Sequence, residues 1–154
     1  MAGILLMAHQ PQASALEQSA RHVFSRDPRC ANYRLRSLDV EPDADPAELE
    51  QRARALVAET DDGNGVLILT DCLGATPANV AARLAQPGKI EVVAGANLPM
   101  LLRALCYCDS PLDALADKAV AGGSRGIARV GPPPPPDRQT PSQDDDLARL
   151  QDQQ

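Results

Sequence analysis

The fold class is indicated by Gly65-Val66-Leu67-Ile68-Leu69-Thr70-Asp71. This run is apolar almost throughout, and a residue with a carboxylate, Asp71, ends it. A strand with one face in water alternates polar and apolar side chains, whereas a strand covered on both faces is apolar along its length. The run Gly3-Ile4-Leu5-Leu6-Met7-Ala8 has the same character. We therefore expect both runs to be central strands of a sheet that helices cover on both faces.

Three further runs complete the predicted sheet. Residues 33–38 alternate polar and apolar side chains, as an edge strand does, and residues 90–94 form a short fourth strand. Residues 126–130 are a candidate for a very short fifth strand. Helix-spaced segments separate the runs, so we predict an α/β fold: an open, mostly parallel four-stranded sheet with right-handed crossovers and helices on both faces.

Five helices are predicted from apolar side chains at helical spacing. Asp45-Pro46-Ala47-Glu48 marks one start as a capping box, and Thr76-Pro77 marks another with Thr76 as its cap. Asn97-Leu98-Pro99 and Ser110-Pro111 open two more, and Gly122-Gly123 ends the last. The apolar faces expected in the core are, helix by helix, Leu16, Ala20, Val23 and Phe24; Leu49, Ala53, Leu56 and Val57; Val80, Ala81 and Leu84; Leu101, Leu102 and Leu105; and Leu112, Leu115, Ala119 and Val120.

The whole chain, 154 residues that are 44% hydrophobic and 23% charged, has the size of one ordinary domain. Its character changes at Gly131, where five prolines at 132–136 lead into a stretch with three consecutive aspartates. This composition predicts a stiff spacer and then a disordered acidic tail, in which the leucines at 147 and 150 are too few to order a helix alone. We assign residues 1–130 to the functional domain and residues 131–154 to the spacer and tail.

Charge and composition argue against several classes of protein. The net charge of −6, with no run of Lys or Arg, disfavours nucleic acid and anionic membranes as partners, and three aromatic residues cannot build a base-stacking platform. The longest apolar run is far shorter than the roughly 20 residues that span a bilayer, so we expect a cytoplasmic chain without membrane insertion. The four cysteines lack the spacing of a disulfide framework or a zinc site, so we expect reduced thiols and no metal.

Two polar residues stand where the central strands end. His9 follows the first run and Asp71 follows the third, and in a parallel sheet the chemistry lies beyond the carboxyl ends of the strands. If these strands are neighbours, the carboxylate of Asp71 can hold one imidazole nitrogen protonated and leave the other free as a nucleophile. Each residue also has an ordinary interpretation, His9 as a loop residue and Asp71 as part of a strand–helix turn.

The residues after Asp71 predict a phosphate site. Gly74 and Ala75 are small, and Thr76 leads into a helix whose first N–H groups face outward, which suits an anion. A nucleophilic imidazole, an orienting carboxylate and backbone dipoles together suggest phosphoryl transfer to a histidine, for which no cofactor or metal is needed.

Three motifs, in this order and spacing, resemble a known family. They are His9 after an apolar strand, Leu69-Thr70-Asp71 with Leu73-Gly74-Ala75-Thr76-Pro77, and Ala94-Gly95-Ala96-Asn97-Leu98-Pro99. Over residues 2–125 the chain resembles the mannose-class (mannose/fructose/sorbose) IIA component of the bacterial phosphoenolpyruvate-dependent sugar phosphotransferase system.

The resemblance implies a phosphotransferase that works through a phosphohistidine. His9 would accept a phosphoryl group from the histidine-containing phosphocarrier protein and pass it to a IIB component, and Asp71 would orient its ring. Thr76 takes the place of a family serine near the phosphate, and Asn97 and Leu98 would line the rim. Gln10 stands where the family has glycine, so we expect a changed rim beside the acceptor.

The family also suggests a homodimer made by exchange of a C-terminal strand, for which residues 126–130 are a minimal candidate. Two alternatives keep His9 as the acceptor: a regulatory binding module that holds its phosphate, and the phosphoryl-donor subunit of dihydroxyacetone kinase. A response-regulator receiver would use Asp71 instead, but Met7-Ala8-His9-Gln10 lacks the acidic pair that such domains carry. In a small-ligand domain His9 would be incidental.

Overall fold

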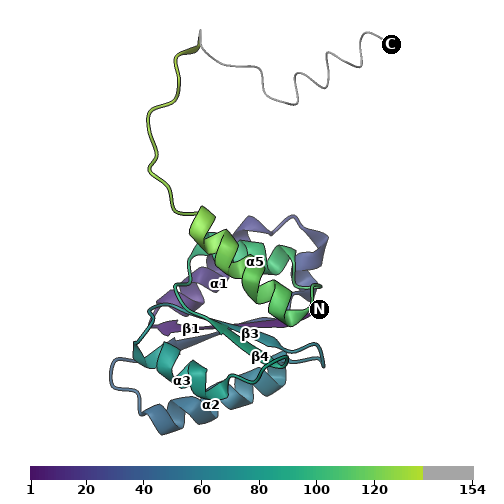
Figure 1. The fold of residues 1–154 in the computed structure, drawn as a ribbon, viewed down its shortest axis with the longest axis vertical. Helices are drawn as coiled ribbons and strands as arrows, with labels where there is room; N and C mark the ends of the chain where they lie inside the picture. The colour runs from purple at the N-terminus through teal and green to yellow at the C-terminus, as the bar shows by residue number, and fades with distance from the viewer. Residues whose placement is uncertain (137–154) are drawn as a thin grey trace.

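The computed structural model describes residues 1–136, and its strands and helices alternate along the chain (Figure 1). In chain order the elements are β1 (Gly3–His9), α1 (Gln12–Val23), the 3-10 helix η1 (Pro28–Asn32), β2 (Leu35–Val40), α2 (Pro46–Thr60), β3 (Val66–Thr70), α3 (Thr76–Leu84), β4 (Ile90–Val93), α4 (Leu98–Cys106) and α5 (Leu112–Arg125).

The strands form one sheet in the order β2-β1-β3-β4, and all three pairings are parallel. β1 and β3 are the central strands and β2 lies at an edge, as their apolar patterns predict. Helices α1 and α5 cover one face of the sheet, and α2 and α3 cover the other (Figure 1). The α/β fold class predicted from the sequence is therefore confirmed.

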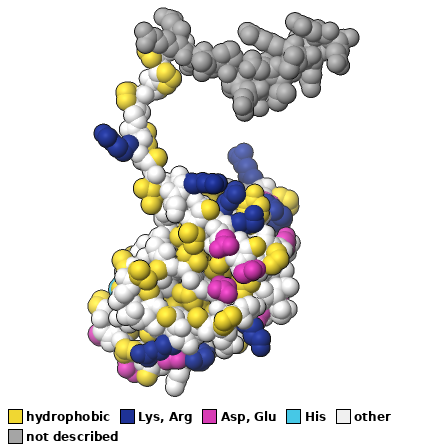
Figure 2. All heavy atoms as spheres, in the orientation of Figure 1, with side chains coloured by type: hydrophobic (Ala, Val, Ile, Leu, Met, Phe, Trp, Pro, Cys, Tyr) yellow, Lys and Arg dark blue, Asp and Glu magenta, His cyan; other side chains and the backbone are white. Residues whose placement is uncertain are grey.

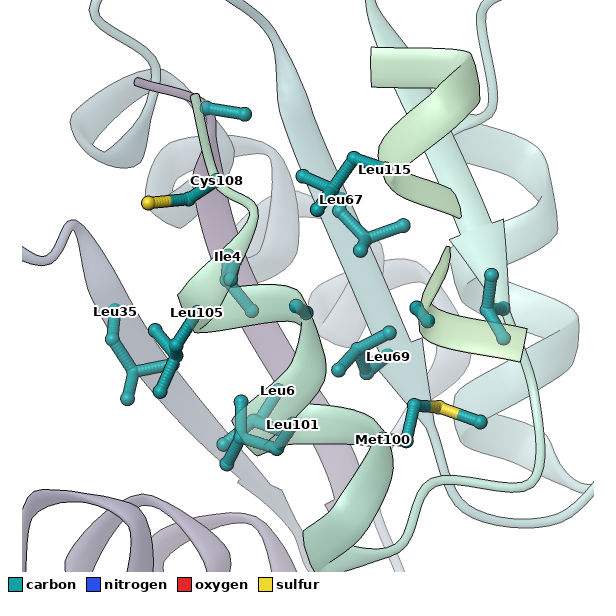
Figure 3. Packing of buried hydrophobic residues seen from close by; sticks show 14 of the residues in the cluster. Ile4, Leu6, Leu35, Leu67, Leu69, Met100, Leu101, Leu105, Cys108 and Leu115 are labelled. Carbon is teal, nitrogen blue, oxygen red and sulfur yellow. The ribbon is translucent and has the colours of Figure 1, made fainter. Parts of the chain in front are cut away.

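Alternate side chains of the central strands enter two separate cores. Ile4 and Leu69 are buried in the core that α1, α4 and α5 close (Figure 3), whereas Leu5 and Ile68 are buried in the core under α2 and α3. Burial of one such aliphatic side chain is worth about 1.5–3 kcal/mol, so both faces of these strands stabilise the sheet. This double burial explains why the two runs are apolar throughout.

The helix starts were predicted well, with one error. Asp45 caps α2 and Asn97 caps α4, each accepting a hydrogen bond from the backbone N–H three residues on, at 3.4 Å and 2.9 Å. The predicted Thr76 cap is wrong: Ala75 is the N-cap of α3, and Thr76 is the first helical residue. Without a capping side chain, the first N–H groups of α3 have no side-chain acceptor there.

The predicted end of α5 at Gly122-Gly123 is also wrong, because the helix continues to Arg125. A Cβ atom on Gly122 would lie 2.6 Å from the Cβ atom of Arg103, and one on Gly123 would lie 2.7 Å from the Cε atom of Met100. These glycines therefore allow α5 to pack closely against α4. Close approach of backbones is a second use of glycine inside helices, and the sequence alone does not separate it from a helix stop.

The helix faces agree with the prediction except at two valines. Val23 and Val120 are about half exposed. In α5 the buried side is the stripe through Leu112, Leu115 and Ala119, and Val120 lies about 100° around the helix from Ala119. Val23 is the last residue of α1.

The predicted fifth strand is absent from the described part of the chain. Residues 127–136 carry no strand, and they lead away from the body (Figure 1). Ile127 and Val130 are 76% and 96% exposed. Within residues 1–136 they pair with no strand, and the sheet ends at β2 on one side and at β4 on the other. The acidic tail predicted from residue 137 onward lies outside the described residues.

Candidate functional site

The carboxyl ends of β1 and β3 bring His9 and Asp71 together. Met7 of β1 is in register with Thr70 of β3, so the two polar residues leave the sheet side by side. The Nδ1 atom of His9 lies 2.6 Å from the Oδ2 atom of Asp71. The imidazole is 48% exposed, whereas the carboxylate is 5% exposed. The imidazole of His9 is therefore accessible from solvent, while the carboxylate that holds it is buried.

Asp71 is held by three hydrogen bonds. Its Oδ2 atom accepts from the backbone N–H of His9 at 2.9 Å as well as from the ring, and its Oδ1 atom accepts from the N–H of Cys72 at 2.8 Å. Burial raises the pKa of the Asp71 carboxyl, but these hydrogen bonds, from His9 first and then from Cys72, outweigh burial and bring the pKa below its ordinary value. Asp71 is thus an ionised acceptor at neutral pH.

This arrangement fixes the protonation of the ring. An ionised carboxylate can only accept hydrogen bonds, so the neutral imidazole carries its proton on Nδ1 and keeps a lone pair on Nε2. No hydrogen bond from the described residues engages Nε2. Its lone pair is therefore available to attack an electrophile that approaches from solvent.

The lowered pKa of Asp71 predicts an acid-dependent stability. A carboxyl with a depressed folded-state pKa contributes stability that is complete above its ordinary value of 3.8 and is lost as the pH falls through the folded-state pKa. We expect the free energy of unfolding to fall less steeply from pH 5 towards about pH 2 in Asp71→Asn than in the wild type. Urea titrations at several pH values measure this, and parallel curves would contradict it.

A second polar contact, which sequence reasoning missed, anchors the chain just after His9. The hydroxyl of Ser14 donates to Asp39 Oδ2 at 2.6 Å, and the N–H of Ser14 donates to Asp39 Oδ1 at 3.0 Å. The N–H of Gln10 donates to the carbonyl of Val40 at 2.9 Å. β2 therefore fixes the start of α1 and the rim residue Gln10, which is exposed. The sequence did contain one signal for this contact, because Asp39 lies near the end of the predicted edge strand.

The turn from β3 into α3 forms the other side of the site. Gly74 has a φ of +85°, a conformation that glycine adopts without strain, and its carbonyl accepts from the side chain of Asn79 at 3.0 Å. Ala75 and Thr76 follow at the open N-terminus of α3. Within residues 1–136 no hydrogen bond joins His9 to these residues, and the predicted phosphate-binding residues follow Asp71 in the turn. Leu73 at the tip of the turn is 89% exposed.

The loop after β4 lies beside Asp71 as well. The N–H of Gly95 donates to the Asp71 carbonyl, and that of Ala96 donates to the Thr70 carbonyl, both at 2.8 Å. Asn97, however, uses its side chain within the fold: its oxygen caps α4, and its nitrogen donates to the carbonyl of Gly123 at 3.1 Å. Leu98 is partly buried against the core. Asn97 therefore joins α4 to α5 in addition to lying in the loop next to the site.

Comparison with known proteins gives this geometry a context. Residues 3–120 match the family model described as "PTS system fructose IIA component", where PTS is the phosphotransferase system. The chain belongs to this family. The sequence-based recognition of a mannose-class IIA component is confirmed, and a IIA component of a sugar phosphotransferase system replaces the receiver and small-ligand alternatives.

Relatives of this IIA chain agree in sequence and in fold. The mannose-specific EIIAB component of Escherichia coli K12 is 34% identical over 93 residues, which cover 58% of this chain and 29% of that protein. The EIIA component from Streptococcus agalactiae is 25% identical, with a TM-score of 0.71 over 84% of this chain and 97% of that one. The mannose/sorbose-specific IIA subunit from Enterococcus faecalis, at 22% identity, shares the fold with a TM-score of 0.73 over 86% and 97% of the two chains.

The remaining site-related expectations concern cysteines, metals and membranes. All four cysteines are free, and Cys72 is exposed beside Asp71. Within residues 1–136 no group of three or more His, Cys, Asp or Glu side chains could hold a metal ion. None of the helices there is long and apolar enough to cross a bilayer.

Proposed function

We propose that this IIA chain is a cytoplasmic phosphocarrier in which His9 is the phosphoacceptor. The observation that carries the proposal is the contact of 2.6 Å between His9 Nδ1 and the buried Asp71 carboxylate. This contact leaves Nε2 as the nucleophilic atom on an exposed ring. The donor is the histidine-containing phosphocarrier protein, and the acceptor is a IIB component.

The transfer step exchanges one N–P bond for another. The Nε2 lone pair of His9 attacks the phosphorus of the donor's phosphohistidine, the new bond forms to Nε2, and the donor imidazole leaves with the electrons of the old bond. The proton on Nδ1 stays in its hydrogen bond to Asp71, which stabilises the positive charge that the ring acquires. In onward transfer a nucleophile of IIB attacks the phosphorus, and the imidazole of His9 leaves with the electrons of its N–P bond.

The β3–α3 turn would receive the phosphoryl oxygens. The N-terminus of α3 has N–H groups without a capping side chain, and such groups bind anions well. We assign Gly74, Ala75 and Thr76 to this role. Leu73, with its apolar side chain in solvent beside the site, suits an apolar patch on a protein partner. Gln10 and the loop of Asn97 and Leu98 complete the proposed rim.

Onward transfer distinguishes a carrier from a regulator. We expect the phosphorylated chain to lose its phosphoryl group within seconds to minutes when a IIB domain, such as that of the mannose-specific EIIAB relative, is added with a sugar-specific membrane component. Intact mass measures the loss of about 80 Da, one phosphoryl group. A chain that keeps its phosphate with each IIB domain tested would instead be the regulatory binding module.

The exposed edge of β4 supports a homodimer. Within residues 1–136, β3 is the strand that pairs with β4. On the other edge Ile90 forms an isolated bridge with Gln86, and the part of this edge beyond the bridge can offer N–H and C=O groups to another strand. Ile127 and Val130, exposed beyond α5, would supply that strand from a second copy. We expect sedimentation to give twice the 16.3 kDa of one chain, and Ile127→Lys/Val130→Lys to shift the protein to monomers. A wild type that stays monomeric at high concentration would contradict this assembly.

A further inference from the structure

The start of α1, shortly after His9, is capped by a residue from another strand. Its N-cap residue, Pro11, supplies no side-chain acceptor, and the first turn of the helix has no acidic residue. An N-cap side chain usually accepts from the N–H of the second or third helical residue. In α1 the third residue is Ser14, and its N–H donates to Asp39 Oδ1 at 3.0 Å. Asp39 of β2, 25 positions along the chain, therefore takes the place of a local cap.

The hydroxyl of Ser14 carries this contact back towards His9. It donates to Asp39 Oδ2 at 2.6 Å, and its oxygen also lies 3.1 Å from the carbonyl oxygen of Pro11. Pro11 and Gln10 are the two residues that connect β1 to α1. A displacement of Ser14 is therefore passed to a connection that has little slack.

Hydrogen bonds, rather than burial, hold the chain at this point. Residues 9–12 are all exposed, so neither core fixes their side chains. The backbone N–H of His9 donates to Asp71 Oδ2, and that of Gln10 donates to the carbonyl of Val40, both at 2.9 Å. The ring of His9 therefore leaves a backbone that is held on one side by Asp71 and on the other side by β2.

We propose that Asp39 and Ser14 are positioning residues for phosphoryl transfer at His9. This inference rests on the function proposed above. Asp39 fixes the start of α1, the short connection transmits that position to His9, and Nε2 is thereby kept facing the incoming phosphorus. A displacement of about 1 Å between reacting atoms can cost about a hundredfold in rate, so a residue that never touches the phosphoryl group can still control its transfer.

Asp39 could act through its position or through its charge, and two variants separate these effects. Figure 2 shows acidic and basic side chains on the same face of the body, and the net charge of the chain is −6, so one carboxylate changes the overall field little. Asp39→Asn removes the charge and keeps the contacts. Its amide oxygen can accept from the N–H of Ser14, and its NH2 group can donate to Ser14 Oγ, whose proton then turns to the Pro11 carbonyl. Asp39→Ala removes both the charge and the contacts.

A second contact between the same two elements provides a matched control. The hydroxyl of Ser37 in β2 donates to Glu17 Oε2 in α1 at 2.5 Å, which is again a hydrogen bond from a serine to a carboxylate. Val40 is the residue of β2 in register with His9, so Ser37 lies three residues before the level of the site. Ser37→Ala therefore loosens α1 from β2 without releasing the chain next to His9.

The rate of phosphoryl transfer tests the positioning role. The full chain is mixed in quenched flow with increasing concentrations of the phosphorylated histidine-containing phosphocarrier protein. We expect Asp39→Ala to lower the maximal rate constant about tenfold or more and to leave the half-saturating donor concentration within about twofold, because the donor-binding surface is unchanged. Asp39→Asn and Ser37→Ala should both keep a maximal rate constant within about twofold of the wild type.

Two further measurements separate positioning from other effects. Ser14→Ala keeps the N–H bond to Asp39 and loses the hydroxyl bond, so it should slow transfer less than Asp39→Ala. The double variant should be no slower than Asp39→Ala alone, because both changes act through one contact. The ring 15N shifts of His9 should still show the proton on Nδ1 in Asp39→Ala, because Asp71 is untouched. Urea titrations establish that each variant is folded, and Ser14→Ala serves as the test if Asp39→Ala does not fold.

An unchanged maximal rate constant in folded Asp39→Ala, or in Ser14→Ala where Asp39→Ala does not fold, would overturn the proposal. An equal loss in Asp39→Asn would assign the effect to charge, and an equal loss in Ser37→Ala would assign it to a general loosening of α1. Either result would also overturn the positioning role. A wild type that accepts no phosphoryl group from the donor would instead reject the proposed function, so the two failures are distinguishable.

Discussion

Replacing His9 by alanine is expected to abolish phosphoryl acceptance. Wild-type chain incubated with phosphoenolpyruvate, enzyme I and the histidine-containing phosphocarrier protein should gain about 80 Da, one phosphoryl group, and lose it in acid. His9→Ala should gain nothing, because no other side chain combines an exposed imidazole with a buried carboxylate in the part of the chain that the structure describes.

The chain supplies its own matched control for this result. His22 is its only other histidine, and it is exposed on α1. His22→Ala should accept phosphate as the wild type does. His9→Ala should remain folded by circular dichroism, because its half-exposed ring contributes little to either core. Full acceptance by a folded His9→Ala chain would reject His9 as the phosphoacceptor.

Asp71→Asn is expected to slow phosphoryl acceptance by about a hundredfold or more, which is the lower end of the range for a positioned acid–base group. Asp71 has two acceptor oxygens, and both are in use: Oδ2 faces two N–H donors from His9, and Oδ1 faces the N–H of Cys72. An asparagine has one oxygen and one NH2 group. One of these two positions must therefore bring donor against donor.

Either orientation of the new amide harms the site. If its oxygen faces His9, its NH2 group opposes the N–H of Cys72 and the turn shifts. If its NH2 group faces His9, the ring must accept at Nδ1, so the proton moves to Nε2 and blocks the nucleophile. Quenched-flow transfer from the phosphorylated donor measures the rate, with Asp43→Asn as the control for loss of an exposed carboxylate. Unchanged acceptance by Asp71→Asn would remove Asp71 from the mechanism.

The sequence predicted the fold and the pairing of His9 with Asp71 because both follow from strand ends. Two uniformly apolar runs had to be central strands, and parallel neighbours bring their carboxyl ends to the same edge of the sheet. The number of hydrogen bonds that Asp71 accepts could not be predicted, because one of them comes from the backbone N–H of Cys72, whose direction depends on the conformation of the loop. The anchoring of Ser14 by Asp39 was missed for a similar reason: it joins residues 25 positions apart.

The errors have a common physical source in residues with two structural uses. Thr76 fits an N-cap or a first helical position, and the structure uses Ala75 as the cap. Gly122 fits a helix stop or a close helix crossing, and the contact with Arg103 selects the crossing. Residues 126–130 include strand-forming side chains, but the described chain leads away from the sheet after α5, so they pair with no strand of their own domain. In each case the local sequence is compatible with two structures, and tertiary packing determines which of them forms.

The nitrogen of His9 that carries the phosphoryl group depends on the contact with Asp71. The 15N-labelled chain is phosphorylated from the histidine-containing phosphocarrier protein, and long-range 1H–15N and 31P spectra assign the bonded nitrogen. The contact of Nδ1 with Asp71 predicts phosphate on Nε2 of His9, with the proton retained on Nδ1. Phosphate on Nδ1 of His9 or on His22 would contradict this mechanism.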